Sequence, residues 1–429
     1  MQGKFPQRSH NQMRNNNKNR RAFISSLFGK STPREFEETL LDGPRSGLKI
    51  TSIKVFHPKP EPKVSNSAVY VKIETNEGVS GWGEADKDYK LICCDFIEKV
   101  LKPHFLGKDP FQIDKLWTLA YFKTYSQGAH GLLAGALSGI DIALWDLKGK
   151  ALNVPVYKLL GGKFKSRIKL YGSFGANIKS HEKEQYGRSG KKTPLEMAKI
   201  AADYVDQGYK AIKVRMQIRQ LNIDPNPDPS FETVKEVRKA VGDDITIFFD
   251  ANNGYTAHRA IEHGQKLREW YNIASIEEPV TMNNYHELRE VSEALDFPIT
   301  AGEHEYTRWH FRDLVTIGGV DILNPDLIKS SGISECKKIA ALGQVFDRRF
   351  MIHNAYPGLA TATALHFVTS CPNAAEYQEY AGPRYWMGLQ KYFKNELKVD
   401  KGHLAVPGAT GLGMEVDEKA ITKANIYQP

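Results

Sequence analysis

Three acidic residues stand at the ends of short apolar runs and recur at nearly equal intervals along the chain. The runs are ThrIlePhePheAsp, ending at Asp250, AlaSerIleGlu, ending at Glu277, and ProIleThrAlaGlyGlu, ending at Glu303. The intervals of 27 and 26 positions each accommodate one strand, one helix and two loops. A continuous apolar run is typical of a parallel strand buried on both faces, so the pattern predicts an α/β protein with a (β/α) barrel.

The carboxyl ends of barrel strands meet at one mouth, where active sites lie. Neighbouring strands would therefore bring Asp250, Glu277 and Glu303 together. Carboxylates that lie so close together repel one another unless a cation lies between them. Hard oxygen ligands of this kind suit Mg2+, which keeps several waters and accepts substrate oxygens. The alternative, in which all are surface acids at strand ends, fits one such residue better than three in phase.

Composition restricts the class of protein. Apolar content of 41% and charged content of 25% are ordinary for a soluble globular protein, and no run approaches the ~20 apolar residues of a membrane span. The four cysteines form no CxxC pattern, so neither a zinc site nor a disulfide framework is predicted, and a reducing cytoplasm is expected.

The net charge of +9 is concentrated at the N-terminus. Residues 1–47 hold nine Lys/Arg and four Asp/Glu, a net of +5, which leaves +4 for the rest of the chain. This distribution favours neither a nucleic-acid nor a membrane partner and is compatible with a small anionic substrate. We also expect a homo-oligomer.

The chain divides into three predicted regions. Residues 1–47 form a basic extension with little to bury, for which we expect disorder. Its stretch from Asn19 loosely resembles a twin-arginine export signal, but the apolar part is short for such a leader, so export is only an alternative to the cytoplasm. Residues 48–163 form an α+β domain, completed by about 391–429, and 164–390 form the barrel.

Within the α+β domain, alternating apolar residues predict an antiparallel meander of three strands before 85, and helical patterns follow from about 92 to 154. The loops at 57–66 and 216–230 are expected to form a lid and part of the mouth, and to set specificity. The predicted barrel strands are 167–171, 211–215, 246–250, 274–277, 298–303, 320–326, 349–353 and 374–378.

Further functional side chains follow these strands. The second strand ends in Lys213-x-Arg215, and the sixth and seventh end in Asp326 and His353. A carboxylate can orient an imidazole and raise its basicity, so Asp326 and His353 predict a histidine base. The eighth strand carries an acid, for which Glu376 is favoured over Glu379, three residues further on.

The motifs and their order resemble the enolase superfamily, in particular its mandelate racemase/muconate lactonizing enzyme-like subgroup and the acid-sugar dehydratases within it, rhamnonate dehydratase among them. The resemblance covers roughly residues 48–420. The matching segments are Lys213-x-Arg215, AspAlaAsn at 250–252, GluGluPro at 277–279, GlyGlu at 302–303, ProAsp at 325–326, His353, AspIleAlaLeuTrpAsp at 141–146 and the ProGlyAlaThrGlyLeuGlyMetGlu run near the C-terminus.

The resemblance implies a capping α+β domain, a modified TIM barrel of the (β/α)7β type, one Mg2+ and removal of the proton α to a carboxylate. It implies metal ligation by Asp250, Glu277 and Glu303. The implied catalytic residues are His353, Asp326, Lys213 and a protonated Glu376, and the implied substrate-binding residues are Arg215, Asn252, His304 and Glu379.

Two positions depart from related enzymes. Racemases of the subgroup carry a second lysine where this chain has Arg215, and an arginine stays protonated and so is a poor base. Galactonate dehydratase-like members place a histidine where this chain has Asn252. The resemblance therefore implies a lyase, a Mg2+-dependent acid-sugar dehydratase that forms a 2-keto-3-deoxy acid.

Three other functions stay open at this point. A cycloisomerase acting on an anhydro-sugar acid such as 3,6-anhydrogalactonate would share the first half-reaction. A racemase or epimerase would use the same scaffold. A non-catalytic sugar-acid-binding protein would keep the fold without turnover.

Deleting residues 1–40 should leave solubility and turnover nearly unchanged, because this stretch lacks an apolar face to bury. Sedimentation and steady-state assays of the shortened chain would check this. A large loss of turnover would show instead that the extension contributes to the active site.

Overall fold

The computed structural model describes most of the chain beyond residue 46. The described ranges are 47–59, 68–128, 130–175, 192–216, 223–354, 357–380 and 389–429. The predicted disorder of the extension, the lid at 57–66 and the mouth loop at 216–230 therefore lie wholly or partly outside the described residues. In these ranges no helix combines the length and apolar character that crossing a membrane requires.

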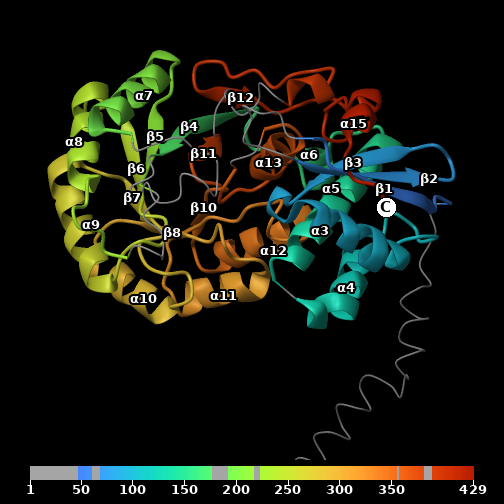
Figure 1. The fold of residues 1–429 in the computed structure, drawn as a ribbon, viewed down its shortest axis with the longest axis horizontal. Coiled ribbons are helices and arrows are strands. Elements are labelled where there is room, and N and C mark those ends of the chain that lie inside the picture. Colours follow the sequence, from blue (N-terminus) through green and yellow to red (C-terminus); the bar gives the residue numbers. More distant parts are fainter. Residues whose placement is uncertain are drawn as a thin grey trace, which may run out of the picture. The chain divides into compact units, whose positions relative to one another are not determined.

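The first described part is an α+β unit with an antiparallel sheet in the order β1-β2-β3, as the alternating pattern predicts (Figure 1). Helix α5 packs on β2 and β3. Glycines permit this close approach, since a Cβ on Gly83 would lie 2.1 Å from the carbonyl oxygen of Gly139. The elements are β1 Ile50–Phe56, β2 Val69–Thr75, β3 Ser80–Ala85, η1 Lys87–Tyr89, α3 Lys90–Asp95, η2 Phe96–Leu101, η3 Lys102–His104, α4 Ile113–Thr124, η4 Tyr125–Gln127, α5 Leu132–Ala151 and α6 Val156–Leu159.

A barrel of parallel strands follows, in the order β10-β9-β8-β7-β6-β5-β4-β11. A parallel bridge between Phe350 and Ala374 joins the two ends of this order. The strands are β4 Arg167–Gly175, β5 Ala211–Arg215, β6 Thr246–Asp250, β7 Ser275–Glu277, β8 Ile299–Ala301, β9 Ile322–Leu323, β10 Arg349–Phe350 and β11 Tyr377–Tyr380. The predicted (β/α)7β barrel with a capping domain is therefore confirmed.

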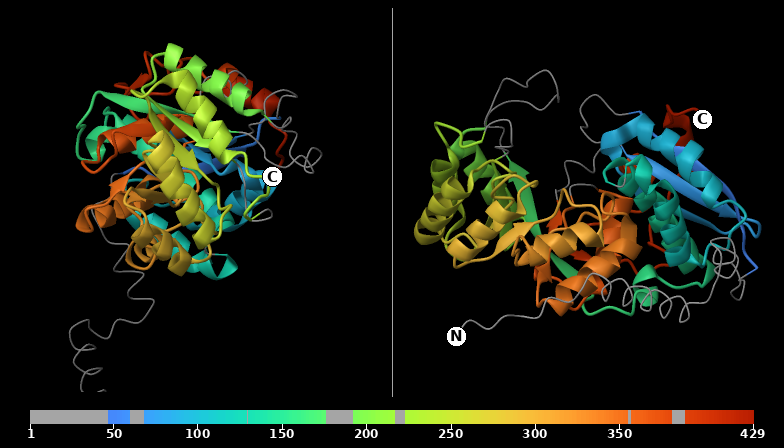
Figure 2. Two further views of the ribbon diagram at one scale, coloured as in Figure 1. Left: turned by 90° about the vertical axis from the view of Figure 1, so that its left-hand side faces the viewer. Right: turned by 90° about the horizontal axis from the view of Figure 1, so that it is seen from below.

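Among the described residues an α-helix lies between each pair of successive barrel strands, and Figures 1 and 2 show α7 to α10 on the outside of the strands. The helices bury apolar residues on the face that packs against the strands, as α8 does with Val234 and Val237. Their bounds are α7 Pro194–Asp206, α8 Ser230–Val241, α9 Ala257–Tyr271, α10 Tyr285–Ala294, α11 Arg308–Thr316, α12 Gly332–Val345 and α13 Leu359–Thr369.

The residues after 389 contact both parts of the molecule. Strand β12 (His403–Ala405) pairs antiparallel with β4 and so extends the barrel sheet. Further on, the Leu412 amide donates to Asp146 of α5 at 2.8 Å, and Asn425 forms a bridge with Pro58. The remaining elements are η7 Gln390–Tyr392 and α15 Glu418–Ala424.

Two buried acids of the cap hold it against the mouth end of the barrel. Glu84 of β3 accepts a hydrogen bond from the Ala360 amide at 3.0 Å, and Asp141 of α5 accepts one from the Ser334 amide at 3.0 Å. Both amides belong to the first turns of helices, α13 and α12, where backbone N–H groups lack helical partners and attract negative charge. These helices follow the strands that lead to His353 and Asp326, so the cap lies over the mouth.

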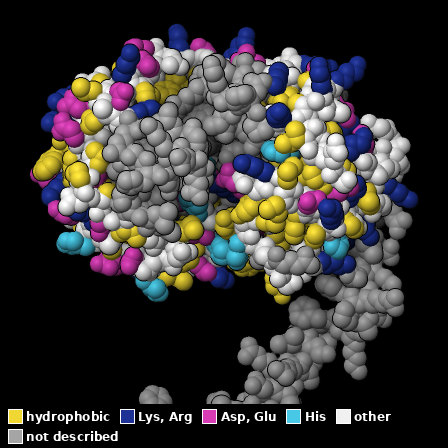
Figure 3. Space-filling view, in the orientation of Figure 1, with side chains coloured by type: hydrophobic (Ala, Val, Ile, Leu, Met, Phe, Trp, Pro, Cys, Tyr) yellow, Lys and Arg dark blue, Asp and Glu magenta, His cyan; other side chains and the backbone are white. Residues whose placement is uncertain are grey.

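Figure 3 shows acidic and basic side chains interspersed over one described face of the molecule. An extended surface of one sign is the usual electrostatic feature of a nucleic-acid-binding protein. On the described part of this face, charges of both signs are mixed.

Burial raises the pKa of Asp141 to about 7, which means that the folded state binds this proton more tightly than the unfolded chain does. Stability from this group should therefore be greatest at low pH and fall as pH rises from about 4 to 7. Asp141→Asn removes the titration. The free energy of unfolding of wild type, relative to that of the variant, should decrease over this window by up to about 4 kcal/mol.

Urea denaturation at several pH values would measure the difference. Asp400→Asn is the matched control, because the Asp400 side chain is 63% exposed, pairs with Arg167 in the barrel and is not among the charges that shift the pKa of Asp141. A wild-type stability that rises over the same window relative to Asp141→Asn would contradict the assignment.

Candidate active site

Strand register brings the predicted ligands together. Asp250 is the partner of Glu277 on the neighbouring strand, and Arg215 is the partner of Asp250 on the other side. All stand at the carboxyl ends of their strands, so they meet at one end of the barrel. Glu303 lies two residues beyond β8 at the same end. The side chains of Asp250, Glu277 and Glu303 are buried.

The ammonium group of Lys213 lies at the centre of this acidic cluster. Its Nζ atom is 2.6 Å from Glu277 Oε1, 3.2 Å from Glu379 Oε1 and 3.6 Å from Asp250 Oδ2. Lys213 is only 1% exposed, and its Nζ also lies 5.7 Å from the ring centroid of Tyr171. A buried cation among several acids offsets their repulsion in the absence of metal.

The acids differ in how strongly they retain protons. Burial raises the pKa of Asp250 to about 7 and the pKa of Glu277 well above its usual value, although Lys213 opposes both shifts. Burial alone would raise the pKa of Glu379, but Lys213 and His353 lower it to about 2. Burial would lower the pKa of Lys213, but Glu277 and Glu379 raise it well above its usual value. The acids around Lys213 therefore favour its charged form.

The predicted base is oriented by the predicted acid. His353 Nδ1 lies 2.7 Å from Asp326 Oδ2, so Nδ1–H donates to the carboxylate and Nε2 faces the cluster. Nε2 is 3.1 Å from Glu303 Oε2. Burial would lower the pKa of His353, but Glu303, Glu379 and Asp326 together raise it. This is the arrangement that a histidine base requires.

Glu303 lies between two histidines. Its Oε2 faces His353, and its Oε1 is 3.6 Å from Nδ1 of His304. Burial alone would raise the pKa of Glu303, but His353 and His304 hold it well below its usual value. His304 is partly exposed, and the carboxylate of Glu278 raises its pKa to about 9.

The expected position of Glu376 in the site is wrong. Glu376 precedes β11, its side chain is 60% exposed, and it pairs with Lys169 near the amino end of the barrel strands. Glu379 occupies the site instead, 3.2 Å from Lys213. The strand begins at Tyr377 and not at 374, and residues three apart on a strand point to opposite faces. The low pKa of Glu379 also makes it an anion and not the protonated acid that was expected.

The remaining predicted residues lie around the acids. Asn252 is buried, and its backbone N–H donates to Asp250 Oδ1 at 2.8 Å. Its Nδ2 lies 3.5 Å from Glu303 Oε1. Arg215 is partly buried at the end of β5, where its positive charge acts on Asp250.

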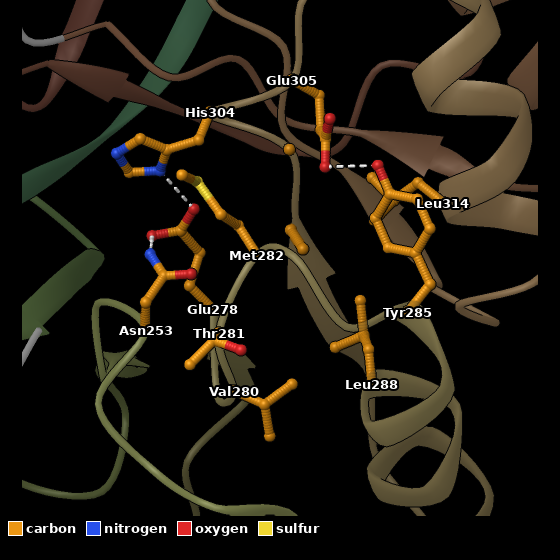
Figure 4. Close-up of a pocket in the computed structure, with 12 residues that line it drawn as sticks. Asn253, Glu278, Val280, Thr281, Met282, Tyr285, Leu288, His304, Glu305 and Leu314 are labelled. Carbon is orange, nitrogen blue, oxygen red and sulfur yellow. Dashed lines mark hydrogen bonds and ion pairs between the residues drawn. The ribbon is translucent and has the colours of Figure 1, made fainter. Parts of the chain in front are cut away.

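Glu278 is a further buried acid at the barrel mouth, which the sequence analysis did not single out. Its Oε1 lies 2.6 Å from His304 Nδ1, and its Oε2 accepts a hydrogen bond from Asn253 Nδ2 at 2.6 Å (Figure 4). Glu278 belongs to the GluGluPro motif at 277–279, in which Glu277 ends the apolar run. The one available signal was a second acid directly after a predicted ligand.

The donor set fits a hard divalent cation. Asp250 Oδ2 and Glu277 Oε2 are buried oxygens without a hydrogen-bond partner in the described part of the chain, and Glu303 supplies a third carboxylate. Mg2+ prefers such oxygens. A neighbouring group made of Glu278, Glu303 and His304 also has ligand atoms within 4.8 Å of one another. Its Glu278 and His304 atoms are, however, already paired with each other.

Comparison with known proteins identifies relatives along most of the chain. Residues 54–161 match the mandelate racemase/muconate lactonizing enzyme N-terminal domain, and residues 196–420 match the enolase C-terminal domain-like family. An arabinonate dehydratase from Saccharolobus solfataricus is 33% identical over 81% of this chain and 88% of its own length. A D-galactonate dehydratase from Xanthomonas oryzae is 30% identical over 89% of this chain and 96% of its own length.

Solved structures agree with this assignment. A mandelate racemase/muconate lactonizing protein from Paracoccus denitrificans has a TM-score of 0.80 at 29% identity, covering 88% of this chain and 98% of that one. The same kind of protein complexed with magnesium gives 0.79 at 28% identity, with the same coverage. The 3,6-anhydro-D-galactonate cycloisomerase of Zobellia galactanivorans gives 0.75 at 28% identity, covering 88% and 100%. The chain belongs to the enolase superfamily, in its mandelate racemase/muconate lactonizing enzyme-like subgroup.

Proposed function

We propose that this enzyme is a Mg2+-dependent acid-sugar dehydratase, a lyase that converts a sugar acid into a 2-keto-3-deoxy acid. The observation that carries the proposal is the His353–Asp326 pair, whose second ring nitrogen, Nε2, faces a buried acid cluster at the barrel mouth. The named dehydratase relatives support the same reaction class.

Asp250, Glu277 and Glu303 are the residues that would hold the metal. When bound, the ion would supply positive charge to the substrate carboxylate, whose α-proton is scarcely acidic in water. Lys213 contributes a second positive charge in the same place, because the acids around its buried ammonium favour the charged form. Removing water from such a site strengthens each of these electrostatic interactions.

His353 removes the α-proton through Nε2, and Asp326 holds the ring in the required tautomer and stabilises the imidazolium that forms. The β-hydroxyl then leaves as water, taking a proton either from His353 or from another acid. The resulting enol converts to the 2-keto acid. Arg215 stays protonated, so it serves as a hydrogen-bond donor to substrate oxygens and not as a second base.

A cycloisomerase is the second candidate, favoured by the similarity to the Zobellia enzyme. The α-proton would leave in the same way, but a ring ether oxygen would depart in place of water. The two functions therefore share the site and differ only in the leaving group.

A panel of mono- and di-acid sugars, including an anhydro-sugar acid, tests both candidates through 2-keto acid formation. Turnover should disappear on exhaustive chelation and return with Mg2+. If only the anhydro-sugar acid is turned over, the enzyme is a cycloisomerase and not a dehydratase. Turnover that survives chelation would overturn the metal assignment.

His353→Asn should lower turnover by about three or four orders of magnitude, because His353 is the one base that the proposed mechanism uses. The native enzyme in D2O should return unreacted substrate with its C2 configuration unchanged, since the position opposite holds Arg215. Mass spectrometry and chiral chromatography of recovered substrate would measure this.

Lys213→Ala in D2O is the matched comparison for His353→Asn. The C2 epimer recovered from native enzyme, or α-proton exchange that persists in His353→Asn and stops in Lys213→Ala, would contradict the single-base mechanism.

A further inference from the structure

The carboxylate of Glu278 receives donors from two other loops of the mouth. Its Oε1 pairs with His304 Nδ1 from the loop after β8, at 2.6 Å. Its Oε2 accepts from Asn253 Nδ2 at 2.6 Å and from Asn252 Nδ2 at 3.4 Å, both in the loop after β6. The Glu278 side chain is only 3% exposed. One buried anion therefore connects three neighbouring loops.

The backbone around this carboxylate adopts an uncommon conformation. Asn252, Asn253 and Glu278 have positive φ values of 55°, 65° and 42°. For residues other than glycine such values are uncommon, and for a glutamate the cost is about 1–2 kcal/mol. The hydrogen bond from the Asn253 amide to the Glu278 carbonyl, at 2.8 Å, joins two of these residues directly. Strained backbone of this kind concentrates at functional sites.

The hydrogen bonds to Glu278 determine which atoms face the substrate. Because Glu278 holds Nδ1 of His304, the ring presents Nε2 on its other side, and Figure 4 shows this nitrogen directed away from Glu278. The side-chain nitrogen of Asn252 is directed to two carboxylates, at the longer distances of 3.4 Å from Glu278 and 3.5 Å from Glu303. Both residues are expected to bind substrate, and Glu303 lies between His304 and the base His353.

We propose that Glu278 is a positioning residue that fixes His304 and Asn252 as hydrogen-bonding partners for substrate hydroxyl groups, opposite the side from which His353 acts. This inference rests on the proposed function, since it concerns the residues of the same site that would recognise the substrate hydroxyl groups. In this proposal Glu278 acts through these two residues and not as a metal ligand, since its two oxygens hold His304 and Asn253, and the Mg2+ affinities described below distinguish the two roles.

Glu278→Gln tests the proposal with almost no change in volume. The amide retains one acceptor but places a donor against His304 or Asn253, so the hydrogen bonds conflict. We expect kcat/KM to fall by about 10–100-fold, as for other residues that orient binding groups. The losses of Glu278→Gln and His304→Gln should be less than additive in the double variant, because the part that acts through His304 is lost only once, whereas a merely structural role would make the two losses add.

Magnesium affinity, measured by calorimetry without substrate, separates positioning from ligation. Glu277→Gln should lose most of its affinity for Mg2+, and Glu278→Gln should retain it within about threefold. Glu305→Gln is the matched control, because Glu305 follows His304 directly but pairs with Tyr285 on the other side of the pocket, at 2.7 Å (Figure 4). This control should keep native kcat/KM and native affinity.

A crystal structure of Glu278→Gln supplies a measurement that does not depend on turnover, and it should show the His304 ring displaced. Glu278→Asp, which retains the charge, should recover part of the lost activity and shows that any effect is not one of misfolding. The proposal is overturned by loss of Mg2+ affinity equal to that of Glu277→Gln, by additive losses in the double variant, or by an unmoved His304. Absence of wild-type turnover on every sugar acid would refute the proposed function while leaving the crystallographic and affinity results to decide the role of Glu278.

Discussion

The buried ammonium group of Lys213 is the interaction on which the rest of the site depends. It lies within 3.6 Å of oxygens from Asp250, Glu277 and Glu379, which come from different barrel strands. Without it, burying these acids side by side would cost several kcal/mol for each uncompensated charge. With it, the carboxyl ends of β5, β6, β7 and β11 can meet at a mouth that holds acids for a cation.

The two histidines near this charge, His353 and His304, lie in different environments. His353 is held by Asp326 and is fully enclosed, which suits a base that must accept a proton in one direction. His304 is held by Glu278 and remains partly exposed, which suits a group that meets substrate. Each histidine has its own carboxylate, and Glu303 lies between the two. Under the proposed function, this division separates the side on which His353 acts as base from the side on which His304 meets substrate hydroxyl groups.

Much of the architecture could be predicted from short-range patterns. The strands 211–215 and 246–250 have the bounds that their apolar runs predict, and the spacing from Asp250 to Glu277 and Glu303 correctly implied neighbouring strands. The eighth strand was misplaced because AlaAlaGluTyrGln contains no residue that marks its start. An error of three positions reverses the face on which a strand residue points, and so exchanged Glu376 for Glu379.

The sequence by itself determined which residue types stand at the carboxyl ends of the strands, because the period of apolar residues and the loop lengths are local properties of the chain. It thereby determined the barrel, the acid cluster and the His353–Asp326 pair. Only the tertiary structure decided that Glu278 turns away from Glu277 to hold His304 and Asn253. The direction of the Glu278 side chain depends on the positive φ of this residue and on donors from two loops that are about 25 residues away along the chain. Neither feature leaves a local pattern in the sequence.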